Sequence, residues 1–241
     1  MANPFFQFKQ VTIYQDRCAM KVTTDACFFG AWAANEIQNE KLRIRNVLDI
    51  GAGTGLLSLM IAQKTKTEID AVEIDKDAAQ QAKENIQASF WKNQIHVLNE
   101  DIISFKTNKQ YDCIISNPPF YENELSSEIK KKNIAHHSEQ LRISQVLKII
   151  RTYLKEEGIF FLMYPYKRKK EIEKLFSENQ LYLTDSIILK QSVNHSAFRM
   201  IVKGCTQKMK ANKEISVSVW NELQQYTTEF VHLLKDYYLN L

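Results

Sequence analysis

Three glycines at alternating positions, Gly51, Gly53 and Gly55, are the clearest chemical signal in the sequence. They follow a short apolar run that ends in Asp49-Ile50 and precede an apolar stretch with helical spacing. This order is typical of a strand, a tight turn and a helix. Glycine permits the turn and lets backbone N–H groups approach a ligand at the positive end of the helix. The spacing is not the G-x-G-x-x-G of dinucleotide-binding proteins, so by itself it predicts only a nucleotide-like cofactor.

Acidic residues follow the next two predicted strands. Glu73 ends an apolar strand, a position from which a carboxylate accepts hydrogen bonds from ribose hydroxyls. Residues 94–98 form a third strand, and Asp101 and Ile102 come after it, where the ligand-side loops of a parallel sheet lie. We predict that Asp101, rather than Glu100, accepts a hydrogen bond from an adenine amino group, while Ile102 covers the ring. A solvated loop carboxylate is the alternative for Asp101.

The fourth predicted strand ends in Asn117-Pro118-Pro119-Phe120. An adenine amino group is a poor nucleophile because its lone pair is delocalised, and two acceptors aimed at its N–H bonds stabilise the positive charge that develops as it reacts. Asn117 supplies one acceptor through its side-chain carbonyl, and Pro118, which has no N–H, presents its backbone carbonyl as the second. Phe120 offers a flat face for stacking, worth roughly 1–3 kcal/mol. A Pro-Pro pair that merely ends a strand is disfavoured because the glycine turn and the ribose acid precede it.

Glycine turn, ribose acid and Asn-Pro-Pro-aromatic, in this order, resemble the S-adenosylmethionine-dependent methyltransferases that act on amino groups. The resemblance implies S-adenosyl-L-methionine as the cofactor. The catalytic residues predicted on this basis are Asn117, Pro118 and Phe120. The predicted cofactor-binding residues come from several segments of the chain: Thr24, Asp25, Asp49, Gly51, Gly53, Gly55, Glu73, Asp101, Ile102 and Asn117.

Thr24 and Asp25 precede an apolar helical stretch at residues 26–34 and have two interpretations. Either residue is a suitable N-cap for that helix. Alternatively, they close over the methionine end of the cofactor, whose ammonium group favours a nearby carboxylate or carbonyl. The sequence leaves both roles open.

The formal net charge of +4 is compatible with a nucleic-acid substrate but is far below that of a protein that coats nucleic acid. Substrate contacts are predicted at Lys21, Tyr121, Lys167, Arg168, His195 and Arg199, with structural roles as the alternative for the last two. Basic runs are typical of solvated faces, but with an RNA substrate they contact its backbone: Lys130–Lys132, Lys167–Lys170, Lys208, Lys210 and Lys213. His136-His137 has no partner at ligand spacing, so no metal site is predicted.

The 241 residues are enough to bury a full core. Four scattered cysteines without C-x-x-C spacing predict reduced, structural thiols. No leader pattern or long apolar run is present, so we predict a cytoplasmic protein without membrane association. We predict one domain, with an N-terminal strand and helix extension (1–45), a Rossmann-like core (46–204) and a C-terminal helical tail (205–241).

Other segments of the sequence narrow the resemblance to a single family. The specific one is Asp16–Val22, and it is accompanied by Phe8-Lys9-Gln10, Thr24-Asp25, Gly30-Ala31-Trp32, Ser116–Phe120 and Phe198-Arg199-Met200. Together they resemble the bacterial tRNA(Val) (adenine-37-N6)-methyltransferases. This implies an α/β, Rossmann-like class I methyltransferase with a mostly parallel seven-stranded sheet and helices on both faces. It also implies methylation of adenosine 37 in the anticodon loop of valine tRNA. The family's cofactor and catalytic roles then fall on Gly51, Gly53, Glu73, Asp101, Asn117 and Phe120.

Three alternatives remain. An adenine of ribosomal RNA or DNA presents the same amine, and a protein glutamine amide presents the same two N–H bonds. The basic clusters and the Asp16–Val22 segment speak against the amide. A module that binds cofactor and RNA without catalysis is the third alternative, and the intact Asn117–Phe120 motif speaks against it. No obligatory protein partner is evident from the sequence.

Overall fold

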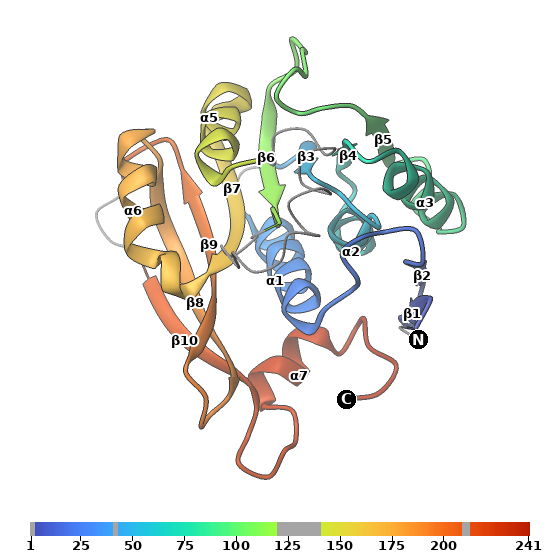
Figure 1. The fold of residues 1–241 in the computed structure, drawn as a ribbon, viewed down its shortest axis with the longest axis vertical. Coiled ribbons are helices and arrows are strands. Elements are labelled where there is room, and N and C mark those ends of the chain that lie inside the picture. The colour runs from blue at the N-terminus through green and yellow to red at the C-terminus, as the bar shows by residue number, and fades with distance from the viewer. Residues whose placement is uncertain (1–2, 41–42, 120–140, 209–212) are drawn as a thin grey trace, which may run out of the picture.

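A single large sheet organises the computed structural model, which describes residues 3–40, 43–119, 141–208 and 213–241 (Figure 1). The strand order is β10-β8-β9-β7-β6-β3-β4-β5. The strands are β3 (Asn46–Ile50), β4 (Glu68–Glu73), β5 (Ile95–Asn99), β6 (Tyr111–Ser116), β7 (Leu154–Pro165), β8 (Tyr182–Ser192), β9 (Ala197–Cys205) and β10 (Lys213–Trp220). Pairing is parallel except that β9 runs antiparallel to both β7 and β8. The seven parallel strands therefore end at a common edge, which we call the carboxyl edge.

Helices cover both faces of this sheet, as predicted. One buried cluster joins α1 (Thr24–Asn39), α2 (Leu56–Lys64) and α7 (Thr228–Leu234) to one face, with Ile86 of α3 (Lys76–Gln87) also in it. The second cluster joins α5 (Ile143–Tyr153) and α6 (Lys169–Glu178) to the other face. The central strands β3 and β6 contribute to both clusters, which explains why their sequences are apolar on both faces.

The two ends of the described chain pack together against the helical layer of α1 and α2. β1 (Phe5–Gln7) and β2 (Thr12–Tyr14) form an antiparallel hairpin, and the C-terminal segment after α7 runs beside it (Figure 1). Phe8 and Tyr238 form a β-bridge, and the rings of Phe6, Phe8 and Tyr238 are in mutual contact. The N-terminal extension is therefore part of the packed structure.

The C-terminal prediction was wrong in its secondary structure. Residues 205–241 are not a helical tail, because Lys213–Trp220 forms β10, an eighth strand parallel to β8. Val217 and Val219 are buried at a spacing of two, a strand period that precedes the helical spacing further on. Among the described residues of this segment, only α7, which has seven residues, is helical. The proposed division into one domain with these bounds stays a prediction.

The first helix also differs from expectation. α1 begins at Thr24, and its N-cap is Thr23, so neither Thr24 nor Asp25 is the cap. It continues to Asn39, beyond the apolar stretch at residues 26–34, because Ile37 is buried and Glu36 pairs with Lys203 of β9. Among the described residues, no helix has the length and apolar character needed to cross a bilayer.

Candidate functional site

Four predicted site segments meet at the carboxyl edge. The glycine turn follows β3, Glu73 ends β4, Asp101 lies just beyond β5, and Asn117 follows β6. These strands are neighbours in the order β6-β3-β4-β5 and run in the same direction, so their ends lie side by side. Loops at this edge of a parallel α/β sheet are the usual place for a ligand.

The glycine turn requires glycine for its backbone conformation. Gly51, Gly53 and Gly55 have φ values of +73°, +55° and +82°, in a region that other residues rarely adopt. A Cβ on Gly51 or Gly53 would meet no atom within 4 Å, so conformation rather than crowding selects glycine at these two positions. The turn is tied to β4 because the N–H groups of Gly51 and Ala52 donate to the Val72 carbonyl.

Glu73 is fixed against that turn. Its Oε2 accepts a hydrogen bond from the Gly53 N–H at 2.8 Å, and Oε1 accepts one from the Asp75 N–H at 2.9 Å. Asn99 supports the same corner by donating to the Glu73 carbonyl. Each carboxylate oxygen can accept a second hydrogen bond, so Glu73 retains acceptor capacity for ribose hydroxyls.

Asp49 has an unsatisfied oxygen. The residue is 0% exposed; its Oδ2 accepts from Ser58 Oγ at 2.7 Å, whereas Oδ1 is buried and has no partner among the described residues. Burial raises the pKa of Asp49 to about 6, and the Ser58 hydroxyl opposes this rise. A buried acceptor without a donor is unusual and marks a place where a ligand donor fits. The acceptors at this edge thus suit a cofactor with a cationic group and ribose hydroxyls.

Asp101 and Ile102 divide between solvent and core. Asp101 is half-buried, and its Oδ1 accepts a hydrogen bond from the Ile103 N–H at 2.9 Å. Ile102 is buried in the same cluster as Leu48, Ile50 and Val72. An apolar side chain beside a carboxylate is compatible with the predicted adenine contact.

Asn117 and Pro118 leave β6 directly at the carboxyl edge. Ser116 donates to the Ile50 carbonyl of β3 at 2.9 Å, which ties the end of β6 to the start of the glycine turn. Asn117 is half-buried and Pro118 is buried. Some predicted residues lie outside the described part of the chain: Phe120, Tyr121, Lys130–Lys132, His136-His137 and Lys210.

The structure joins two residues that we had assigned to different ligands. Asp25, in the first turn of α1, accepts a hydrogen bond from Arg199 Nε of β9 at 2.8 Å. The two residues are 174 positions apart. Asp25 is buried and Arg199 is partly exposed, so the pair closes the space between α1 and β9 at the carboxyl edge. Thr24 begins α1 beside it.

The other predicted substrate contacts are held by intramolecular partners. Lys21 donates to the carbonyls of Gln15 and Cys18. Arg168 donates two hydrogen bonds to Glu171, at 2.9 and 2.7 Å. His195 lies in the turn between β8 and β9, with its Nδ1 2.6 Å from Ser192 Oγ. Lys167 is exposed in the short 3₁₀ helix η1 (Tyr166–Arg168). Lys208 and Lys213 are also exposed.

Two buried amides on α3, which sequence reasoning missed, hold the N-terminal segment in place. Asn85 donates to the carbonyls of Tyr14 and Thr54 and accepts from the Tyr14 N–H, so it links β2 to the glycine turn. One turn earlier, Gln81 donates to Asp16 and accepts from the Arg17 N–H. The available signal was their spacing of four on the alanine-rich face of α3.

This anchoring brings the Asp16–Val22 segment close to Glu73. Cys18 of that segment is buried, and burial together with the nearby charge of Glu73 raises the pKa of its thiol to about 11. A thiol with so high a pKa is protonated at neutral pH and is not a nucleophile. Cys18 is therefore a packing residue beside the predicted ribose site.

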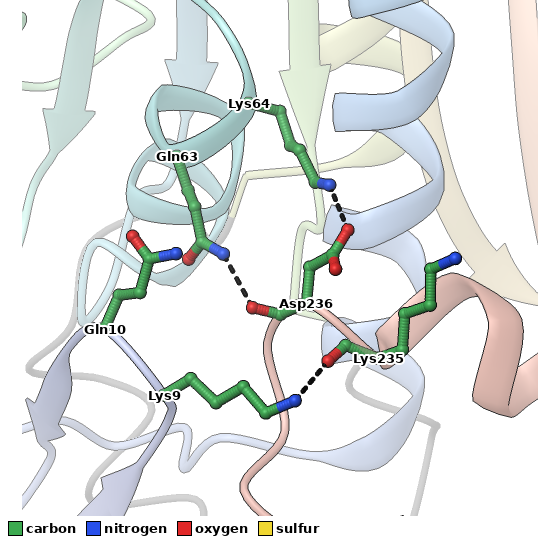
Figure 2. Close-up of a pocket in the computed structure, with 6 residues that line it drawn as sticks. All are labelled: Lys9, Gln10, Gln63, Lys64, Lys235 and Asp236. Atoms are coloured by element: carbon green, nitrogen blue, oxygen red, sulfur yellow. Dashed lines mark hydrogen bonds and ion pairs between the residues drawn. The ribbon is translucent and has the colours of Figure 1, made fainter.

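A polar pocket between the chain ends and α2 is distinct from this site (Figure 2). Lys9 donates to the Lys235 carbonyl, Lys64 pairs with Asp236, and Gln63 donates to the Asp236 carbonyl. Its basic groups thus join the hairpin, α2 and the C-terminal segment to one another. We interpret this pocket as a structural junction.

No group of three or more His, Cys, Asp or Glu residues suited to a metal ion occurs within the described ranges. All four cysteines are free thiols, three of them buried.

Comparisons with known proteins agree with this arrangement. The family model for the methyltransferase small domain matches residues 33–178. A protein of Dyadobacter fermentans is 39% identical over 241 residues, covering 98% of both chains, and one of Bacteroides thetaiotaomicron is 37% identical over 249 residues, covering 100% of both. Both are named tRNA1(Val) (adenine(37)-N6)-methyltransferase.

Solved structures share the fold at low sequence identity. A predicted O-methyltransferase from Agrobacterium tumefaciens has a TM-score of 0.65 and 14% identity, with 90% of this chain and 99% of that chain covered. An S-adenosylmethionine-dependent methyltransferase from Clostridium acetobutylicum has a TM-score of 0.52 and 15% identity, covering 78% and 94%. The methyltransferase family and fold imply the use of S-adenosylmethionine. The chain is an enzyme that belongs to the tRNA1(Val) (adenine(37)-N6)-methyltransferase family.

Proposed function

We propose that this enzyme transfers a methyl group from S-adenosylmethionine to N6 of adenosine 37 in the anticodon loop of valine tRNA. The observation that carries the proposal is the placement of Asn117-Pro118 at the carboxyl edge, next to the glycine turn that Glu73 holds. Relatives at 37% and 39% identity over nearly the whole chain, with the same activity in their names, support the choice of substrate. An RNA substrate of this kind would place the enzyme in the cytoplasm.

The residues at the carboxyl edge fit the parts of this cofactor. Glu73 would accept hydrogen bonds from the ribose hydroxyls, and Asp101 would accept one from the adenine amino group beside Ile102. The positive φ values at Gly51, Gly53 and Gly55 keep the turn free of side chains where a ligand must approach. Asp49 and the Thr24-Asp25 corner would face the methionine end. When bound, S-adenosylmethionine supplies an electrophilic methyl group on its sulfonium.

Asn117 and Pro118 would activate the amine that accepts this methyl group. The side-chain carbonyl of Asn117 and the backbone carbonyl of Pro118 would each accept one N6–H bond. These bonds would favour tetrahedral geometry at the nitrogen and stabilise its positive charge. The proton can then leave to water, so no dedicated general base is required. Phe120 is proposed to stack on the adenine.

The substrate side involves the residues at the ends of β7 and β9. Lys167 is exposed there, and Arg168 and Arg199 pair with the carboxylates of Glu171 and Asp25. We propose that these three, with Lys21, Tyr121 and His195, contact the RNA, and that an RNA phosphate competes with Glu171 for Arg168.

The test is transfer of labelled methyl from S-adenosylmethionine into fractionated RNA, DNA and protein from cells that lack the gene. N6-methyladenosine at position 37 of valine tRNA is the expected product. Label in ribosomal RNA or DNA would keep the chemistry and reject the substrate. Methylated glutamine in protein would support the amide alternative, and no label in any pool would favour the non-catalytic module.

A further inference from the structure

Ser58 is a buried hydroxyl directed at an acid of the proposed cofactor site. It lies in the first turn of α2, between Leu57 and Leu59, and is 0% exposed. Its Oγ donates to Asp49 Oδ2 at 2.7 Å. Serine weakens a helix interior because its hydroxyl competes for backbone hydrogen bonds. Among apolar neighbours, its bond to a carboxylate is a specific feature that calls for explanation.

The bond occupies one oxygen of Asp49 and leaves the other free. Oδ1 is buried and has no hydrogen-bond partner within the described residues. Leaving a buried acceptor unpaired is costly, and more so for a charged group. A ligand that brings a donor, and above all a cation, removes that cost. Asp49 directly precedes Ile50 and the glycine turn, so its carboxylate is close in the chain to the proposed cofactor site.

We propose that Ser58 is a positioning residue for the cofactor: its hydroxyl holds the Asp49 carboxylate so that Oδ1 accepts a hydrogen bond from the ammonium group of the methionine moiety. This inference rests on the proposed function. Ser58 does not touch the cofactor and acts only through Asp49. The contact between ammonium and carboxylate is a charge-assisted hydrogen bond, which is stronger than a neutral one.

Ser58 also affects the protonation of Asp49, and this second effect likewise favours binding of the ammonium group. Burial above all, with a smaller effect of the Glu73 charge, raises the pKa of Asp49 to about 6, although hydrogen bonds from the Ser58 side chain and backbone act to lower it. Removing the hydroxyl would therefore move Asp49 toward its neutral form near pH 7, where it attracts an ammonium group less.

The test compares two ligands that differ at the methionine end. S-adenosylhomocysteine carries the ammonium group, whereas 5′-methylthioadenosine keeps the adenosine and sulfur but lacks the amino-acid part. Calorimetry on the full chain should show that Ser58→Ala weakens S-adenosylhomocysteine about tenfold. The same variant should leave the affinity for 5′-methylthioadenosine unchanged. A general disturbance of the site would weaken both ligands equally.

A double-variant cycle tests whether Ser58 acts through Asp49. Asp49→Asn removes the charge, so adding Ser58→Ala to it should cause no further loss of S-adenosylhomocysteine affinity. Ser116→Ala is the matched control, because Ser116 is equally buried at the same edge but donates to a backbone carbonyl. It should leave the ratio of the two affinities at the wild-type value.

Ser58→Thr keeps the hydroxyl and is the control for a folding defect caused by substitution at this position. It should retain the wild-type ratio of the two affinities even where its added methyl weakens both. Equal weakening of both ligands by Ser58→Ala, an unchanged affinity for S-adenosylhomocysteine, or an additive loss in the Asp49→Asn background would each overturn the role of Ser58. Wild-type enzyme that binds no S-adenosylhomocysteine would instead overturn the proposed function.

Discussion

The two halves of the carboxyl edge differ in the sequence range of their contacts. At β3, β4 and α2, Glu73 bonds to Gly53 at a separation of 20 residues, and Asp49 bonds to Ser58 at a separation of 9. At β9, Arg199 pairs with Asp25 of α1 at a separation of 174 residues. The proposed cofactor half is thus built from segments that are close in sequence, whereas the substrate half joins α1 to β9, two elements that only the complete fold brings together.

This difference predicts which half of the carboxyl edge should tolerate substitutions. Contacts within a compact βαβ unit form with the unit itself, and its polar side chains Asp49 and Glu73 have proposed roles in cofactor binding. Partly exposed ion pairs between distant segments contribute less stability, because solvent screens them and their side chains lose entropy. We therefore expect the largest losses of function from the first half and at the boundary residue Asn117.

The largest expected effect is that of Asn117→Ala. Removing one of two acceptors for the amine should lower the rate of methyl transfer at least about a hundredfold. Affinity for S-adenosylhomocysteine should change little, since the glycine turn and Glu73 remain. Single-turnover transfer into valine tRNA and calorimetry measure the two quantities. Unchanged turnover would remove the proposed role of Asn117.

The next largest effect is expected at Glu73, the proposed acceptor for the ribose hydroxyls. Glu73→Ala should weaken S-adenosylhomocysteine binding by about thirtyfold, because it removes a charged acceptor and also frees the N–H groups of Gly53 and Asp75. Asp101→Ala should weaken it less, by about fivefold, since Asp101 is half-buried and not tied to the turn. Calorimetry on both variants tests the ranking, and wild-type affinity in both would refute the assignments.

Asp49→Asn should weaken cofactor binding but raise the free energy of unfolding. Burial raises the pKa of Asp49 to about 6, from about 4 in the unfolded chain. Between these values the folded protein retains a proton that the unfolded chain has released, so the contribution of Asp49 to the free energy of unfolding falls as pH rises from about 4 to 6. The variant should therefore be more stable than wild type by about 2 kcal/mol above pH 7, and equal to it near pH 4. Urea unfolding across this range checks the trend, and a pH-independent difference would contradict it.

The smallest effects are expected at two arginines of the substrate half. Arg199→Ala leaves the buried Asp25 without its cation, and we expect a stability loss of about 1 kcal/mol, measured by urea unfolding. Arg168→Ala breaks an i,i+3 pair with an exposed glutamate, which is worth less than about 0.5 kcal/mol. Both should weaken valine tRNA in filter binding by a few-fold, and neither should alter affinity for S-adenosylhomocysteine. A loss of that affinity in Arg199→Ala would place Arg199 in the cofactor half.

The order of strands, turns and acids along residues 46–117 was predictable because each signal is local. Gly51, Gly53 and Gly55 reflect backbone conformations that glycine adopts readily, and Glu73 and Asn117 stand at the ends of apolar runs. The C-terminal segment was not predictable in the same way. Val217 and Val219 have the local strand spacing of two, but their burial depends on the addition of β10 to β8, a partner that local periodicity does not identify.

The sequence by itself determined the candidate residues of the site, since residue type and position at strand ends indicate a glycine turn, a proposed ribose acid and two proposed acceptors for an amine. Only the tertiary structure decided the partners of these groups: Ser58 on Asp49, Arg199 on Asp25, and Asn85 between β2 and the turn. The physical reason is that conformational preferences act over a few residues, whereas hydrogen bonds and ion pairs depend on proximity in space, which folding alone creates.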